Sequence, residues 1–134
     1  MPQEQYHLLA VQKNIKFLNR SEEKVFISKD FPEWSTVVMF YVCVHIIEAA
    51  LDPHTHCESH QDRWTSLLAD KARFNLDFRT KYEDLYQLSR RARYLTKKGY
   101  SISIPDLEDA DGSYQFILTY AKTSFGFTIN PNDK

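Results

Sequence analysis

A cluster of histidine and cysteine side chains lies in the stretch LDPHTHCESHQDR, residues 51–63. Imidazole and thiolate are good zinc ligands, but structural zinc sites draw four ligands from separated elements, usually in paired motifs. Here the candidate ligands crowd into a single loop: His54, His56, Cys57 and His60. We therefore expect neither a metal ion nor another cofactor. We interpret the loop as a turn between two helices, in which Ser59 of the sequence SHQD caps the second helix.

A polar triplet interrupts the most apolar stretch of the chain. Tyr41, His45 and Glu48 are spaced i, i+4 and i+7, which places them on one face of a helix. Buried polar groups must be hydrogen-bonded, so these side chains could satisfy one another or reach a neighbouring helix. Alternatively, they could line a cleft in which His45 accepts a proton near neutral pH. No serine or cysteine nucleophile signature accompanies them.

A basic and aromatic segment follows at LYQLSRRARYLTKKGY, residues 85–100. Residues 71–100 hold nine Lys or Arg against three Asp or Glu, a local balance of +6 in a chain whose net charge is -1. Arginine can pair with phosphate in a bidentate manner, and aromatic rings can stack on bases. The segment is therefore a candidate phosphate-binding surface; a solvated helix face is the alternative. Its candidate residues are Arg90, Arg91, Arg93, Tyr94 and Lys98.

The composition indicates one helical domain. The chain has 134 residues, which suits a single core, and its three glycines exclude a glycine-rich phosphate loop and disfavour a turn-rich all-β fold. The N-terminus is polar and amphipathic rather than signal-like, the longest apolar run is too short to span a bilayer, and two cysteines do not make a disulfide framework. We expect a cytoplasmic, reduced protein that does not contact a membrane.

Helical spacing of apolar residues predicts the elements that position these groups. The segment 34–51 is apolar on nearly every face, which indicates a central helix enclosed by its neighbours. We predict an all-α, up-down bundle of four to five helices with its core at about residues 5–122 and a tail at 123–134. The expected helices cover about 4–19, 34–51, a segment from 59, about 78–95, and a segment starting after Ile104-Pro105.

Four segments together resemble the HEPN superfamily: FYVCVHIIEAAL, SHQDR, LYQLSRRARY and DLEDADGSYQFILTYA. The most similar branch carries a Tyr-x-x-x-His step, a His at the start of the next helix, and an Arg-x-x-x-Tyr near the end of the fourth helix. The matching positions in this chain are Tyr41 with His45, His60, and Arg90 with Tyr94.

The resemblance implies an up-down helical bundle that forms homodimers and binds RNA or a nucleotide. Some members of this superfamily partner with nucleotidyltransferases in toxin–antitoxin pairs or act in defence systems. Many are metal-independent ribonucleases that use an Arg followed four to six residues later by a His.

This chain departs from the ribonuclease pattern, because its last histidine is His60 and none follows the arginines. Arg93, Lys98 and Tyr100 match an extended form of the motif with Lys in the place of His, and a lysine is a poor general base at neutral pH unless it is desolvated. We expect a non-catalytic RNA- or nucleotide-binding domain in which Tyr41, Glu48 and Arg63 support the cleft. The alternatives are a divergent ribonuclease using His45 or His60, and a protein-interaction module that binds no nucleic acid.

Overall fold

The computed structural model describes residues 3–22, 32–51, 55, 57–95 and 101–133. The described part of the chain forms five α-helices and contains no strand, which confirms the predicted all-α bundle. The helices are α1 (Gln3–Glu22), α2 (Pro32–Ala50), α3 (His60–Ala69), α4 (Leu76–Arg90) and α5 (Ile104–Thr123), and the π-helical turn η1 (Arg91–Leu95) continues α4.

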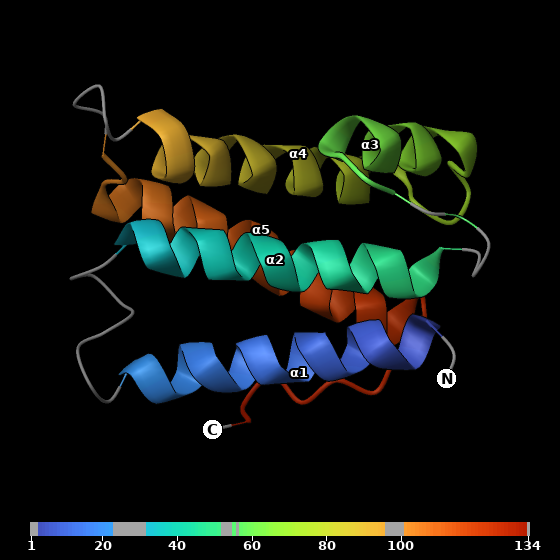
Figure 1. Ribbon diagram of the computed structural model, residues 1–134, viewed down its shortest axis with the longest axis horizontal. Helices are drawn as coiled ribbons and strands as arrows, with labels where there is room; N and C mark the ends of the chain where they lie inside the picture. The colour runs from blue at the N-terminus through green and yellow to red at the C-terminus, as the bar shows by residue number, and fades with distance from the viewer. Residues whose placement is uncertain (1–2, 23–31, 52–54, 56, 96–100, 134) are drawn as a thin grey trace.

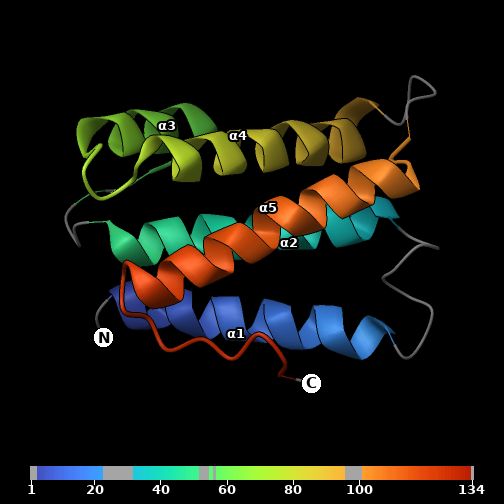
Figure 2. The same cartoon turned by 180° about the vertical axis from the view of Figure 1, so that it is seen from behind.

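The four long helices α1, α2, α4 and α5 run in alternating directions along the bundle (Figure 1), as in an up-down bundle. Helix α1 lies on one side of α2 and α4 on the other, while α5 crosses behind α2 (Figure 2). Helix α2 contacts α1, α4, α5 and η1, as a central helix must. The short α3 lies beside α4 on the front of the bundle.

Helix α2 is buried over most of its length because it is apolar on nearly every face. By length and composition alone it could cross a membrane, but 67% of that apolar window is buried inside the bundle, as in the core helix of a folded domain. Trp34 and Tyr41 are exceptions to the predicted enclosure, and Trp34 is the more exposed, at 61%. It lies in the first turn of α2, and a helix end has fewer neighbours around it than the middle.

Side-chain caps fix where the later helices begin. The Ser59 hydroxyl accepts the amide hydrogen of Asp62 at 3.1 Å, so the predicted cap of α3 is present. The Asp62 carboxylate bonds the amide of Glu58, one residue before the position that a complete capping box requires. Ser103 and Asp106 form a complete capping box at the start of α5.

The segment after α5 is more than a tail. It folds back across α1 (Figure 2), where Gln12 Nε2 donates to the carbonyl oxygen of Asn130 at 2.9 Å and Asn19 Nδ2 to that of Pro131 at 3.0 Å. Ile129 is only 5% exposed and belongs to the core. The core was predicted to end at about residue 122 because the prediction used the apolar spacing of helices. That spacing carries no information about an extended segment such as this one.

Candidate functional site

A buried ion pair links α2 to α3. Glu48 is 7% exposed near the end of α2. The Arg63 guanidinium of α3 donates through Nε to Glu48 Oε1 at 3.1 Å. Since an unpaired charge at this depth would be costly, Arg63 is the partner that allows a carboxylate on an otherwise apolar helix. The predicted supporting residues Glu48 and Arg63 therefore do meet.

The same arginine connects to α4 through a tyrosine. Arg63 Nη1 donates to the hydroxyl oxygen of Tyr82 at 3.3 Å, and that hydroxyl lies 3.0 Å from His60 Nδ1. Burial raises the pKa of Tyr82 to about 12, so its hydroxyl keeps its proton at neutral pH. A phenol that accepts from Arg63 can donate its own hydrogen to His60 Nδ1, which leaves the other ring nitrogen as the N–H.

His60, at the start of α3, contacts three residues of α4: Tyr82, Glu83 and Tyr86. Its Nε2 lies 3.3 Å from Glu83 Oε2, so a neutral ring with N–H at Nε2 satisfies both neighbours. The ring also stacks face to face on Tyr86, with centroids 3.4 Å apart and an interplanar angle of 3°. Burial, opposed by Glu83 and reinforced by the charges of Arg63 and Arg93, lowers the pKa of His60. The ring is therefore unprotonated at neutral pH.

A second aromatic and cationic contact lies at the other end of α4. The π-helical turn η1 carries Arg93, whose guanidinium carbon lies 5.5 Å from the ring centroid of Phe40 and 5.9 Å from that of Tyr41 on α2. Arg93 Nη1 also reaches the Tyr41 hydroxyl at 3.5 Å. Tyr41 is 41% exposed, so this cation–π contact is at the surface. Short π-helical segments are frequent at functional sites.

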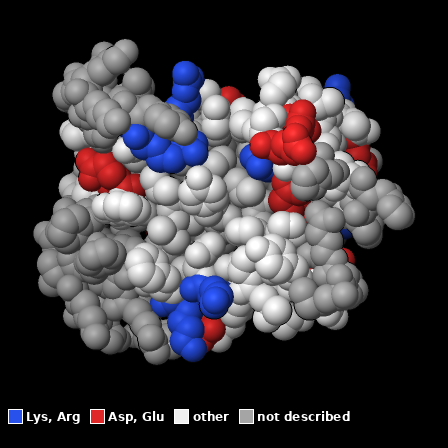
Figure 3. Space-filling view, viewed as in Figure 1, with Lys and Arg blue, Asp and Glu red and all other residues white. Residues whose placement is uncertain are grey.

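The contacts with Arg93 and His60 define one surface, here called the α2–α4 face: Tyr41, His60, Glu83, Tyr86 and Arg93. The Phe40 ring joins the two ends of the face, because it lies under the Arg93 guanidinium and 5.7 Å from the ring of Tyr86, on which His60 stacks. Figure 3 shows Lys and Arg side chains at the C-terminal end of α4 with one acidic group beside them, and a second acidic group farther along toward α3.

The three predicted arginines have different neighbours. Arg90 is exposed, whereas Arg91 Nη2 donates to Asp106 Oδ2 of α5 at 3.1 Å and Arg93 turns toward α2. Successive residues of a helix point in different directions around its axis, so these arginines contact different neighbours. The number of basic residues in the sequence does not show this. The predicted contributions of Lys98 and of the Tyr94 side chain lie outside the described residues.

The predicted triplet of α2 also divides among three neighbours. Tyr41 meets Arg93, Glu48 meets Arg63, and His45 meets His7 of α1, with the two Nδ1 atoms 2.8 Å apart. We had expected these side chains to bond either one another or a neighbouring helix. Contacts with neighbouring helices are the ones observed. His45 does not belong to the α2–α4 face.

The histidine-rich loop makes no visible ligand cluster in the part of the chain that the structure describes. No three His, Cys, Asp or Glu side chains converge there, and Cys57 Sγ lies 3.7 Å from the Ser66 hydroxyl. His54 and His56 are outside the described residues. His60 points away from the loop, toward Tyr82.

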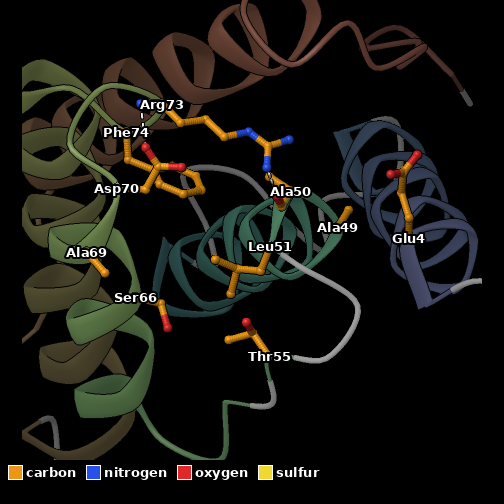
Figure 4. A pocket seen from close by; sticks show the side chains of 10 residues that line it. All are labelled: Glu4, Ala49, Ala50, Leu51, Thr55, Ser66, Ala69, Asp70, Arg73 and Phe74. Carbon is orange, nitrogen blue, oxygen red and sulfur yellow. Dashed lines mark hydrogen bonds between the residues drawn. The ribbon is translucent and has the colours of Figure 1, made fainter.

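A cavity of about 520 Å³ opens at the C-terminal end of α2 (Figure 4). Ala49, Ala50 and Leu51 form one wall, and Arg73 donates through Nη1 to the carbonyl oxygen of Ala50. A cation at this position offsets the negative end of the α2 dipole, so Arg73 caps the helix. None of the residues of the α2–α4 face lines this cavity. We place the candidate site on the face because that is where the titratable and aromatic groups meet.

Sequence reasoning missed four participants: His7, Tyr82, Glu83 and Tyr86. Tyr82 has no exposed surface, and the role of its hydroxyl was not foreseen. The i, i+4 spacing of Tyr82 and Tyr86, with Glu83 between them, was the available signal, because it places two rings in line on one helix face. Their partner His60 lies 22 residues earlier than Tyr82, a contact that periodicity within one helix cannot reveal.

No family model, curated protein or solved structure matches the chain.

Proposed function

We propose that this protein is an HEPN-like domain that binds single-stranded RNA, or a nucleotide, on the α2–α4 face without cleaving it. The observation that carries the proposal is the position of Arg93, whose guanidinium lies over the rings of Phe40 and Tyr41. The Phe40 ring continues this contact to Tyr86, on which His60 stacks. A guanidinium held against aromatic rings presents a planar cation to a phosphate, while the exposed Tyr41 ring offers a stacking surface for a base.

The neighbouring groups support binding more than chemistry. Exposed Arg90 lies three residues before Arg93 and adds positive charge at this end of α4. No histidine follows either arginine in the sequence, so the usual ribonuclease pair cannot form within this helix. The negative carboxylate of Glu83 beside His60 repels phosphate at the other end of the face, which would direct an anionic ligand toward the arginines.

Fluorescence anisotropy with a labelled single-stranded RNA, and separately with a fluorescent nucleotide, tests this proposal. We expect Arg93→Gln to weaken binding by about tenfold or more, because hydrogen bonds to charged groups contribute roughly 1.5–3 kcal/mol. Loss of a phosphate contact should also reduce the slope of log affinity against log salt by about 1. Lys71→Gln is the matched control, since it removes the same charge from an exposed position off this face. Equal affinity in the Arg93 variant and the control would refute the proposal.

A divergent metal-independent ribonuclease is the second candidate, and the observation that favours it is the state of His60. Its ring is oriented by Tyr82 and Glu83 and is neutral at pH 7. It would act as a general base in the other tautomer, which carries the proton on Nδ1 and leaves the Nε2 lone pair, on the side of Glu83, to accept a proton. Incubation of labelled RNA with chelator and pure protein distinguishes the two functions. Cleavage that is lost in His60→Gln and retained in His45→Gln would establish the enzyme and overturn the binding-only proposal.

We also propose a homodimer in the reducing cytoplasm, with a nucleotidyltransferase as a further partner. The free cysteines Cys43 and Cys57 support a reducing compartment.

Light scattering on the purified protein tests the dimer, and a mass of one chain at micromolar concentration would contradict it. Co-purification from the native host tests the partner; recovery of a partner protein with no bound nucleotide would instead favour a protein-interaction module.

A further inference from the structure

The contact between His7 and His45 joins the first turns of α1 to the C-terminal half of α2. The two Nδ1 atoms lie 2.8 Å apart, and the ring centroids lie 5.1 Å apart at an interplanar angle of 37°. Both side chains are partly buried. A hydrogen bond between two imidazole nitrogens requires a proton on one and a lone pair on the other. The pair is therefore stable with one proton between the Nδ1 atoms and loses its bond when both carry one.

From this geometry we propose that His7 and His45 form an acid-sensitive latch that holds the first turns of α1 on α2. When both rings are protonated, two N–H groups and two positive charges face each other across less than 3 Å. The contact then becomes repulsive, and the start of α1 moves away from α2.

The charged groups around the pair do not cancel this repulsion. Glu48 of α2 acts on His7, but its carboxylate is already bound to Arg63. Arg63 of α3 acts on His45 with the same sign as a second proton. From α1 itself, Tyr6 contributes only an edge contact to the His7 ring, with centroids 5.2 Å apart. Burial lowers the pKa of both histidines, which is consistent with a pair that resists full protonation.

The opening should be local because the rest of α1 is anchored differently. Val11 and Ile15 are fully buried in the core, and Gln12 and Asn19 are tied to the C-terminal segment. None of these anchors titrates between pH 5 and 8. Acid therefore releases the turns before Val11 and leaves the remainder of the bundle in place.

The sign of the pH dependence follows from the neutral state of the pair. A histidine whose folded pKa lies below its unfolded value of about 6.5 binds more protons in the open state as the pH falls. The first proton leaves one N–H and one lone pair between the Nδ1 atoms, so the latch is complete above about pH 6.5 and is lost below that pH as the second proton is taken up.

Hydrogen exchange measured between pH 7.5 and 5.0, corrected for the intrinsic pH dependence of exchange, tests the latch. We expect the amides of residues 7–11 to exchange about tenfold faster at the lower pH, the factor that one proton gained over one pH unit produces. The amides of residues 114–121 of α5 serve as the internal reference. In His45→Gln, whose side chain stays neutral, the acceleration should fall below twofold, whereas His60→Gln should keep it.

Ring titration of the wild-type protein by nitrogen-15 NMR gives a measurement that does not depend on any variant folding. We expect linked titrations with midpoints below 6.5. Independent uptake of a proton by each ring near pH 6.5, or unchanged acid acceleration in His45→Gln, would overturn the proposal. So would a rise in melting temperature when one equivalent of zinc is added to metal-free protein, if His45→Gln abolishes it, because the pair would then hold a metal and not a proton.

Discussion

Replacing Arg63 by methionine tests the buried ion pair that ties α2, α3 and α4 together. The substitution keeps most of the apolar stem but leaves the Glu48 carboxylate and the Tyr82 hydroxyl without their donor. The side chains of Arg63 and Glu48 are only 13% and 8% exposed, so solvent can replace little of what is lost.

The expected cost is about 3 kcal/mol of unfolding free energy, at the lower end of the range for breaking a buried pair because Glu48 retains a narrow path to water. A chain of 134 residues has an unfolding entropy of about 0.28 kcal/mol per kelvin, so the melting temperature should fall by roughly 10 °C. Urea denaturation followed by circular dichroism measures the free energy, and calorimetry measures the melting temperature.

The exposed pair Arg91–Asp106 provides the matched control. It has the same chemistry and the same 3.1 Å separation, but its side chains are 37% and 22% exposed. Arg91→Met should cost less than about 1 kcal/mol. The double variant Glu48→Leu with Arg63→Met should recover most of the loss, because two apolar groups leave no buried charge behind. Equal costs for the Arg63 and Arg91 variants would refute the reasoning.

Three further substitutions follow from local structure, each measured by chemical denaturation. Gly112→Ala on α5 meets no atom within 4 Å of the added carbon and should stabilise the protein by about 0.5–1 kcal/mol through the higher helix propensity of alanine; a destabilised variant would mean that this helix surface is not open. Ser89→Ala removes a buried hydroxyl that has no hydrogen-bond partner and should be neutral or stabilising by up to about 1 kcal/mol; a loss above 1 kcal/mol would reveal a missed bond. Ile129→Ala should cost about 2–4 kcal/mol because this side chain is only 5% exposed, and a cost near zero would show that the C-terminal segment does not pack on α1.

The helical architecture could be predicted from the sequence because apolar periodicity and capping residues are local signals. The run from Trp34 to Leu51 predicted the central helix α2, and Ser59 marked the start of α3. Apolar spacing also predicted α4 and α5, whose observed bounds differ by a few residues from the expected ones. Each of these elements is determined by residues within about one or two turns of one another.

The partners of the polar side chains were not predictable in the same way. Whether His45 would face His7, Glu48 or solvent depends on how α1 rotates about its own axis, which no motif within either helix encodes. The divergence of Arg91 and Arg93 depends on the same packing angles. The positions of the charges along the chain predicted a basic end of α4, but only the packed bundle shows that ring contacts through Phe40 and Tyr86 join Arg93 to His60.

The most direct measurement of the central claim is an NMR titration of the nitrogen-15-labelled protein with a short single-stranded RNA. If the α2–α4 face binds phosphate and base together, the signals of Tyr41, Tyr86, His60 and Arg93 will shift at low RNA concentration, and those of the cavity residues Ala69 and Asp70 will not. Shifts confined to the cavity, spread evenly over the basic surface, or absent at millimolar RNA would contradict the account.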